Sequence, residues 1–184
     1  MTTIDAVTIT LIILACVTGA LFFLFVLQPL GLPFVPSRDT TVNEIFFLLG
    51  DIKGKKVLDL GSGNGKIVIA AARAGAAEAI GFEINPLLVK ISRNRIARAG
   101  LSSNARIERA DFWSTDLSDY DIIIFYGVVP AMKRLGEKLE EELKPGGRVV
   151  TSYCELSGWK PKIQQGNVSV YEKTDDETIS KDHS

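Results

Sequence analysis

The stretch KKVLDLGSGNGK, from Lys55 to Lys66, determines the fold that this sequence predicts. Val57, Leu58 and Leu60 indicate a short buried strand, and the alanine-rich residues 67–74 indicate a helix after the glycines. Glycine has no Cβ and accepts backbone angles that other residues avoid, so a ligand can come close to the N-terminus of that helix. We therefore expect a strand, a turn and a helix that together hold a nucleotide-like cofactor, although the same turn can occur in a fold that binds nothing.

The spacing of the glycines separates two classes of cofactor. The dinucleotide fingerprint is G-x-G-x-x-G, whereas here the residue three places after Gly63 is Lys66 and the pattern is G-x-G-x-G. With Asp59 two places ahead of the first glycine, the stretch resembles motif I of the class I S-adenosylmethionine-dependent methyltransferases. That resemblance implies that S-adenosylmethionine is the cofactor and that the residues around its methionine moiety are Asp59, Gly61, Ser62, Gly63 and Gly65.

An acid ends the next predicted strand. Residues 79–83 are apolar up to Glu83, about twenty residues beyond the loop, which fits one strand–helix–strand step. A carboxylate there can accept hydrogen bonds from both ribose hydroxyls of a nucleoside, so we expect Glu83 to bind the ribose; a solvated acid is the alternative. Asn85 follows in the same G-F-E-I-N-P motif and is included in the predicted cofactor site.

A second acid follows the predicted strand at residues 105–109. In the methyltransferases that the chain resembles, an acid here accepts a hydrogen bond from the adenine amino group and an apolar neighbour packs on the ring. Asp111 and Phe112 match those roles. Alone the pair is a weak signal, because Asp followed by an aromatic residue is common at helix caps and turns.

Alternating strand and helix patterns predict an α/β fold. The resemblance implies a Rossmann-like class I methyltransferase fold, whose sheet is doubly wound and mostly parallel. The turn L-K-P-G-G at residues 143–147 strengthens this resemblance, because the same sequence motif precedes strand five throughout that superfamily. Strands are expected at residues 56–60, 79–83, 105–109, 121–126 and 148–153, and helices at residues 41–49, 65–74, 86–99 and 130–143.

The C-terminal end of the predicted sheet is short. The residues after strand five are too few for the helix and two strands that normally complete a class I sheet. Residues 162–165 and 168–172 flank Gly166-Asn167 and predict a hairpin instead. We expect a methyltransferase domain at residues 41–173 and a disordered polar tail at residues 174–184.

The segment from Ala6 to Leu27 contains no charged side chain and is long enough to cross a bilayer. A buried core helix and a cleaved signal peptide are the alternatives, but a signal peptide needs a basic start and this chain begins Met-Thr-Thr-Ile-Asp. Basic residues follow the segment and none precedes it, which predicts a single-pass membrane protein with its catalytic domain on the cytosolic side. We assign residues 1–29 to a transmembrane anchor in the lipid bilayer and residues 30–40 to a Pro-containing linker.

Charge and composition argue against several classes of function. Residues 38–184 hold all 21 basic side chains and all but one of the 22 acidic ones, so their net charge is zero and no nucleic-acid partner is expected. His183 is the sole histidine, and Cys16 and Cys154 lie in different contexts. We therefore expect no metal site, no disulfide framework and no histidine-based catalytic triad.

The whole arrangement narrows the resemblance to one family. A membrane span, the segment P-F-V-P-S at residues 33–37, the glycine loop, G-F-E-I-N-P and D-F-W resemble a small family of membrane-anchored protein lysine methyltransferases. Its mitochondrial members modify the adenine nucleotide translocase and the c subunit of ATP synthase. The resemblance implies a lysine of a membrane protein as substrate, with Pro36 and Ser37 at the substrate cleft. The N-terminus lacks the Arg-rich look of a mitochondrial presequence, which fits a prokaryotic relative.

The chemistry that this resemblance implies is an in-line attack of a neutral amine on a sulfonium methyl group, for which orientation and exclusion of water matter most. Tyr126 ends the predicted fourth strand, where many amine methyltransferases carry D/N-P-P-Y, so it either orients the amine or packs beside the cofactor. Two alternatives remain: a small-molecule or lipid methyltransferase at the membrane surface, and a non-catalytic module that only binds the cofactor.

Overall fold

The structure is a computed structural model, which describes residues 5–27, 39–127 and 131–174. The chain divides into two compact units, residues 1–33 and residues 34–184. Most of the predicted linker at residues 30–40 and all but the first residue of the predicted tail at residues 174–184 lie outside the described residues. Both assignments therefore stay predictions.

The first unit carries helix α1 (Ala6–Leu27). The Asp5 carboxylate caps its N-terminus, since it accepts hydrogen bonds from the Thr8 amide at 2.8 Å and from the Thr8 hydroxyl at 2.6 Å. The predicted helix is thus confirmed. However, a helix with the length and hydropathy of a membrane span is absent from the part of the chain that the structure describes, so the predicted transmembrane anchor is not borne out.

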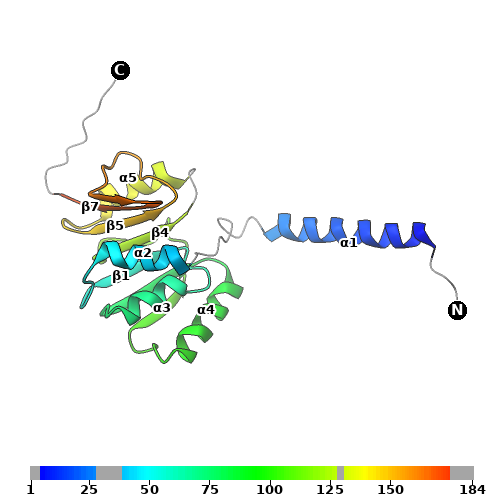
Figure 1. Ribbon diagram of the computed structural model, residues 1–184, viewed down its shortest axis with the longest axis horizontal. Coiled ribbons are helices and arrows are strands. Elements are labelled where there is room, and N and C mark those ends of the chain that lie inside the picture. Colours follow the sequence, from blue (N-terminus) through cyan, green and yellow to red (C-terminus); the bar gives the residue numbers. More distant parts are fainter. Residues whose placement is uncertain (1–4, 28–38, 128–130, 175–184) are drawn as a thin grey trace, which may run out of the picture. The chain divides into compact units, whose positions relative to one another are not determined.

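The second unit is built around a sheet whose seven strands lie in the order β3-β2-β1-β4-β5-β7-β6 within the described residues (Figure 1). The strands are β1 (Lys56–Leu60), β2 (Glu78–Glu83), β3 (Ala105–Arg109), β4 (Ile122–Tyr126), β5 (Arg148–Ser152), β6 (Ile163–Gln165) and β7 (Val168–Glu172). β1 to β5 are parallel, and β7 pairs antiparallel with both β5 and β6. The doubly wound sheet and the terminal hairpin are both confirmed.

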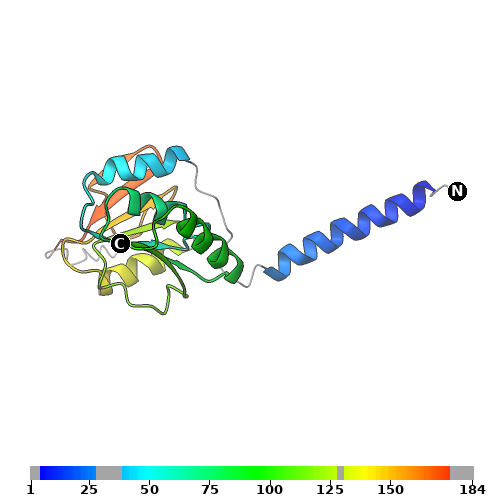
Figure 2. The same cartoon turned by 90° about the horizontal axis from the view of Figure 1, so that it is seen from below.

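Helices cover the two faces of this sheet. Figure 2 shows α2 (Asp39–Leu49), α3 (Lys66–Arg73) and α4 (Pro86–Arg98) on one face and α5 (Met132–Glu142) on the other. Successive residues of a strand point to opposite faces of the sheet and so pack into two different apolar cores. Val57 lies in the core beneath α2, α3 and α4, whereas Leu58 lies in the core beneath α5. The predicted bounds of the helices and of β1 to β5 differ from the observed ones by at most two residues at either end.

The order of the strands places a topological switch point at the carboxyl ends of β1 and β4. The chain winds outward from β1 through β2 to β3 and then returns to β4 on the other side of β1. In doubly wound sheets, ligands bind at such a switch point. The glycine loop, which follows β1, lies at this edge.

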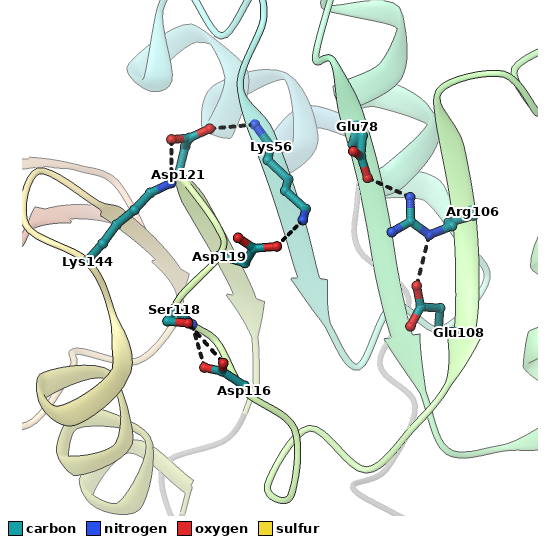
Figure 3. Close-up of polar contacts among 9 residues, drawn as sticks. All are labelled: Lys56, Glu78, Arg106, Glu108, Asp116, Ser118, Asp119, Asp121 and Lys144. Carbon is teal, nitrogen blue, oxygen red and sulfur yellow. Dashed lines mark hydrogen bonds and ion pairs between the residues drawn. The ribbon is translucent and has the colours of Figure 1, made fainter.

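The opposite, amino-terminal edge of the sheet carries charged pairs (Figure 3). Asp121 accepts a hydrogen bond from the Lys56 amide at 2.7 Å and pairs with the Lys144 ammonium at 2.9 Å. Pairs of this exposed kind contribute at most about 1 kcal/mol each. The residues drawn there are Lys56, Glu78, Arg106, Glu108, Asp116, Ser118, Asp119, Asp121 and Lys144.

Candidate cofactor and substrate site

The glycine loop after β1 has the backbone that only glycine adopts easily. Gly61, Gly63 and Gly65 have φ values of 73°, 52° and 76°, all in the left-handed region. A Cβ placed on Gly61 would meet no atom of the described residues within 4 Å, so these residues leave the space beside this glycine open. The predicted loop is therefore present, and it leaves room for a ligand at the point where β1 ends.

Neighbouring elements hold this loop from both sides. The Ser62 amide donates a hydrogen bond to the Phe82 carbonyl at 2.8 Å, which ties the loop to β2. From α4, the Arg95 guanidinium donates to the Asn64 carbonyl at 2.7 Å. These two hydrogen bonds fix the loop between β2 and α4, which is the preorganisation that a cofactor site requires.

The side chain of Ser62 points into the protein rather than into the open space. It is buried, and its hydroxyl has no hydrogen-bond partner among the described residues. A Cβ placed on Gly81 would lie 2.5 Å from both the Cβ and the hydroxyl of Ser62, so only glycine at position 81 lets the loop pack on β2. Ser62, which the sequence placed in the cofactor site, can therefore reach a ligand only through its backbone.

Glu83 connects the end of β2 to the glycine loop. One carboxylate oxygen accepts a hydrogen bond from the Gly63 amide at 2.8 Å, and the other accepts from the Asn85 amide at 2.8 Å. The side chain is only 7% exposed. Because each carboxylate oxygen has a further lone pair, both can still accept from a ligand. The sequence could not show that this acid also holds the loop.

Asp59 is a buried acid at the centre of the site. Its residue is 3% exposed, and burial, together with the charge of Glu83, raises the pKa of the Asp59 carboxyl to about 8. A cationic group placed beside it would reverse part of this shift, because an opposite charge favours the ionised carboxylate. The arrangement therefore suits a ligand that carries an ammonium or sulfonium group.

Asn85 has a structural role that accounts for its position. Its side-chain oxygen accepts hydrogen bonds from the amides of Leu87 at 2.9 Å and Leu88 at 3.4 Å, so it caps the N-terminus of α4. Pro86 follows at the first helical position, where proline is favoured. The side chain that the sequence assigned to the cofactor is thus already engaged by the helix.

Asp111 and Phe112 lie beside Glu83 at the end of β3. The Ala110 amide donates to the Glu83 carbonyl at 3.2 Å, which places the following residues at the same edge. Asp111 is exposed and accepts from the Trp113 amide through one oxygen at 3.0 Å. Phe112 is 8% exposed and its ring centroid lies 4.5 Å from that of Trp113. Asp111 can thus face a ligand, whereas Phe112 offers it little surface.

Two tyrosines form the far side of the site. Tyr126 ends β4 and pairs in register with Ser152 of β5, so Tyr153 follows directly beside it. The two rings have centroids 5.6 Å apart and planes at 75°. Sequence reasoning missed Tyr153, which it placed inside a regular strand. Its φ of 68° breaks the strand there, and no sequence signal indicates a left-handed tyrosine.

Two predicted substrate-cleft residues and the side chains that could bind a metal ion remain to be described. Pro36 and Ser37, expected at the substrate cleft, lie outside the described residues. Among the described residues, no group of three or more His, Cys, Asp or Glu side chains is placed to hold a metal ion. The described residues at this edge offer carboxylates, backbone amides and aromatic rings.

Comparison with known proteins agrees with this geometry. A family model described as the ANTKMT methyltransferase domain matches residues 59–163. A lysine N-methyltransferase of the ATP synthase c subunit, from Rattus norvegicus, is 39% identical over 140 residues, which are 76% of this chain and 64% of that protein. A protein-lysine N-methyltransferase of Saccharolobus islandicus (strain REY15A) is 32% identical over 142 residues, 74% of this chain and 88% of that protein. The chain thus spans less than two thirds of the rat relative.

A solved structure shares the fold. The RNA methyltransferase from Salinibacter ruber in complex with S-adenosyl-L-homocysteine matches with a TM-score of 0.71 and 32% identity, over 80% of this chain and 98% of that chain. The family match begins at Asp59 and includes the glycine loop, Glu83, Asp111 and both tyrosines. The chain has the Rossmann-like class I methyltransferase fold and belongs to the ANTKMT methyltransferase domain family.

Proposed function

We propose that this chain is an S-adenosylmethionine-dependent methyltransferase that methylates a lysine side chain of a protein, in particular of a membrane protein. The observation that carries the proposal is the hydrogen bond from the Gly63 amide to the Glu83 carboxylate, since it joins the loop and the end of β2 into one binding surface. The names of the rat and Saccharolobus relatives support lysine as the acceptor. The name of the rat relative refers to subunit c of ATP synthase, and this supports a membrane protein as the substrate.

Each part of the surface has a role in this proposal. Asp59 receives the ammonium group of the cofactor's methionine moiety, because it is a buried acid that a neighbouring cation would ionise. Glu83 accepts from the ribose hydroxyls with its remaining lone pairs, and Asp111 accepts from the adenine amino group with its second oxygen. The edge of Phe112 borders the adenine. The backbone of the loop, at Gly61, Ser62, Gly63 and Gly65, lies against the methionine moiety, while Asn85 supports Glu83 through its amide.

Held against the glycine loop, Asp59 and Glu83, the cofactor would supply an electrophilic methyl group on a sulfonium sulfur. Attack by a neutral lysine amine would form the carbon–nitrogen bond as the carbon–sulfur bond broke, so the positive charge would pass from sulfur to nitrogen. The lysine first loses one proton to water. The protein's contribution is to hold donor and acceptor in line and to exclude water, and in this proposal Tyr126, at the end of β4, orients the amine. Pro36 and Ser37 keep their assignment to the substrate cleft from the resemblance alone.

We propose in addition that α1 embeds in a lipid bilayer and keeps the catalytic unit on its cytosolic side. Every residue from Val7 to Gly19 is exposed, and large apolar side chains are among them on all sides of the helix. Water-exposed apolar surface of this extent is unusual and marks contact with a membrane or a protein. Resistance of the full chain to alkaline extraction of membranes, with loss of that resistance on deletion of residues 1–29, is the expected result. A full chain that washes off would contradict it.

The test of the enzymatic function is the transfer of a labelled methyl group. The full chain is incubated with methyl-labelled S-adenosylmethionine and detergent-solubilised membranes from its own source, and the label is located by mass spectrometry. Label on a lysine of a membrane protein is the expected result. The double variant Asp59→Ala, Glu83→Ala is expected to neither bind the cofactor nor transfer label.

Other outcomes identify the alternatives. Label in the lipid extract or in small molecules would replace the protein substrate with a lipid or a metabolite, and label in RNA would match the name of the Salinibacter ruber structure. Tight cofactor binding without any transfer would indicate a non-catalytic module. Cofactor binding by the double variant that equals that of the wild type would overturn the site itself.

A further inference from the structure

A cavity of about 320 Å³ lies between α4 and the end of β3. β3 is the outermost strand at this end of the sheet, and α4 packs against it. Three of the side chains that line the cavity are cationic and the others are uncharged; the lining residues are Pro86, Val89, Lys90, Arg93, Asn94 and Arg109. Within the part of the chain that the structure describes, no acid lines this cavity, so its charge favours an anion.

The cations of this cavity lack acidic partners. Among the described residues, no carboxylate forms an ion pair with Lys90, Arg93 or Arg109. On β3, by contrast, the nearby Arg106 pairs with two acids, at 2.7 Å and 2.9 Å. Three like charges around one cavity repel one another, and an anion bound between them would relieve that repulsion.

One hydrogen bond holds Arg93 at the cavity. Its Nε donates to the Ile107 carbonyl of β3 at 2.9 Å, so the side chain reaches from α4 to the outermost strand. The two terminal nitrogens of its guanidinium have no hydrogen-bond partner among the described residues. A guanidinium matches the geometry of phosphate oxygens, and Asn94 adds an amide donor to the lining. These donors fit a phosphate group better than a carboxylate, because a phosphate has more oxygens that can accept from them.

Apolar side chains lie beside these cations on the exposed face of α4. Leu87 and Ile91 are 64% and 40% exposed, and their spacing of four residues makes them neighbours on the helix, with Lys90 beside both. A helix surface that combines large apolar residues with basic ones is typical of segments that lie in the headgroup region of a bilayer. The apolar part favours a lipid over a soluble phosphate, since only a lipid brings apolar surface to it.

This surface adjoins the proposed cofactor site. Arg109 of β3 pairs in register with Glu83 of β2, and Asp111 follows shortly after Arg109. α4 itself begins at Pro86, directly after the Asn85 cap. A bilayer in contact with α4 and with the end of β3 would therefore lie close to the carboxyl edge of the sheet, where the proposed cofactor site is.

We propose that a surface on the catalytic unit binds the headgroups of anionic phospholipids. The surface consists of Leu87, Lys90, Ile91, Arg93 and Arg109. The cavity receives the lipid phosphate, and the two apolar side chains enter the interfacial layer of the bilayer. This contact goes beyond the proposed methyltransferase function and is separate from the membrane embedding proposed for α1. It keeps the carboxyl edge of the sheet at the bilayer surface, where lysines of a membrane protein are within reach.

The test measures lipid binding by the full chain in dodecyl maltoside micelles. The chain is titrated separately with dihexanoyl phosphatidylglycerol, with dihexanoyl phosphatidylcholine and with glycerol 3-phosphate, while NMR follows the backbone amides of residues 87–94. Phosphatidylglycerol should bind at least about fivefold more tightly than phosphatidylcholine, which has the same chains but no net charge. It should also bind more tightly than glycerol 3-phosphate, which has no apolar chains.

Two double variants separate the charged contact from the apolar one. Lys90→Gln with Arg109→Gln should weaken binding of phosphatidylglycerol about 30-fold, because each basic side chain near an anionic headgroup contributes about fivefold. Leu87→Ser with Ile91→Ser should weaken it at least about fivefold through loss of apolar burial. Both variants should still bind S-adenosylhomocysteine, because these residues lie outside the proposed cofactor site, and that binding also shows that they are folded.

A control variant and the alternative ligands keep the inference open to refutation. Lys133→Gln with Lys160→Gln removes two exposed cations outside the cavity and should bind phosphatidylglycerol normally. An equal loss in this control, or undiminished binding by Lys90→Gln with Arg109→Gln, would refute the lipid site. Glycerol 3-phosphate that binds as tightly as the lipid would show a soluble-phosphate site instead, and an RNA oligonucleotide that displaces the lipid more tightly than it binds would show a nucleic-acid site. Failure to bind S-adenosylhomocysteine would overturn the enzymatic proposal and not the lipid site.

Discussion

The Gly63 amide donates a hydrogen bond of 2.8 Å to the carboxylate of Glu83, so the residue that ends β2 also holds the loop that follows β1. Two segments twenty positions apart in the chain are joined at the point where the proposed cofactor lies. Because the other oxygen of Glu83 accepts from Asn85, the carboxylate fixes the start of the β2–α4 connection as well. The shape of the site thus depends on this one acid.

Replacing Glu83 should weaken cofactor binding because the glycine loop loses its hydrogen bond to this side chain. Loss of any direct contact between Glu83 and the cofactor would weaken binding further. Glu83→Ala removes two hydrogen bonds to a charged group, which contribute about 1.5–3 kcal/mol each, so we expect S-adenosylhomocysteine to bind at least about tenfold more weakly. Glu83→Gln should fall between, because its single amide oxygen can replace only one of the two acceptors. Isothermal titration calorimetry measures both. Glu108→Gln, in an exposed pair with Arg106, is the control and should bind normally.

The stability of the ligand-free protein should fall as the pH rises from about 4 to about 8. The Asp59 carboxyl has a pKa near 3.8 when unfolded and about 8 in the folded chain, so across this range the folded state keeps a proton that the unfolded state has lost. Asp59→Asn mimics the protonated acid and removes that dependence. The melting temperature of the variant should therefore rise relative to wild type between pH 5 and pH 8. Melting curves that shift in parallel would argue against a raised pKa.

Gly81→Ala should destabilise the fold at the glycine loop. The new Cβ would lie 2.5 Å from the Ser62 side chain and 2.7 Å from the Ile107 side chain, and overpacking of this kind costs about 1–3 kcal/mol. Adding Ser62→Gly removes the closest atoms and should restore part of the loss. Chemical denaturation of the single and double variants provides the comparison. No recovery in the double variant would show that the strain arises elsewhere.

The backbone strain at Tyr153 should be visible in stability. Tyr153→Asn and Tyr153→Ala both remove the ring, but asparagine accepts a left-handed φ more readily than alanine. We expect the Asn variant to be more stable than the Ala variant by about 1 kcal/mol. The difference in their unfolding free energies isolates the backbone effect. Equal stabilities would mean that the chain relaxes to an ordinary conformation once the ring is absent.

Much of the fold was predictable because its signals are local. Short segments determine their own backbone conformation, namely the apolar run that forms β1, the glycines that follow it and the L-K-P-G-G turn before β5. The alternation of strands and helices then predicts a parallel sheet. The terminal hairpin was predictable for the same reason, since Gly166 and Asn167 supply the turn. The membrane span is different, because the sequence predicted it and the described structure does not bear it out.

The site was less predictable, because its details depend on contacts between distant segments. The sequence identified Glu83 as an acid at a strand end, but its hydrogen bond to Gly63 exists only once β1 and β2 are paired. Ser62 faces Gly81, a contact that no pattern in the loop could reveal. Asn85 is the opposite case. An asparagine before a proline at a helix start is itself a capping signal, so the cap that Asn85 makes on α4 is predictable from the sequence.

The hydrogen bond from Tyr153 to Asn167 makes the site depend on the last part of the sheet to be synthesised. β7, which follows Asn167, inserts between β5 and β6 and ends at Glu172. A nascent chain that has left the ribosome only as far as β5 has its glycine loop but lacks the Asn167 carbonyl that accepts the hydrogen bond from the Tyr153 amide. That hydrogen bond forms only after translation has passed the hairpin, so a chain cut short before that point lacks one of the contacts that fix Tyr153 next to Tyr126.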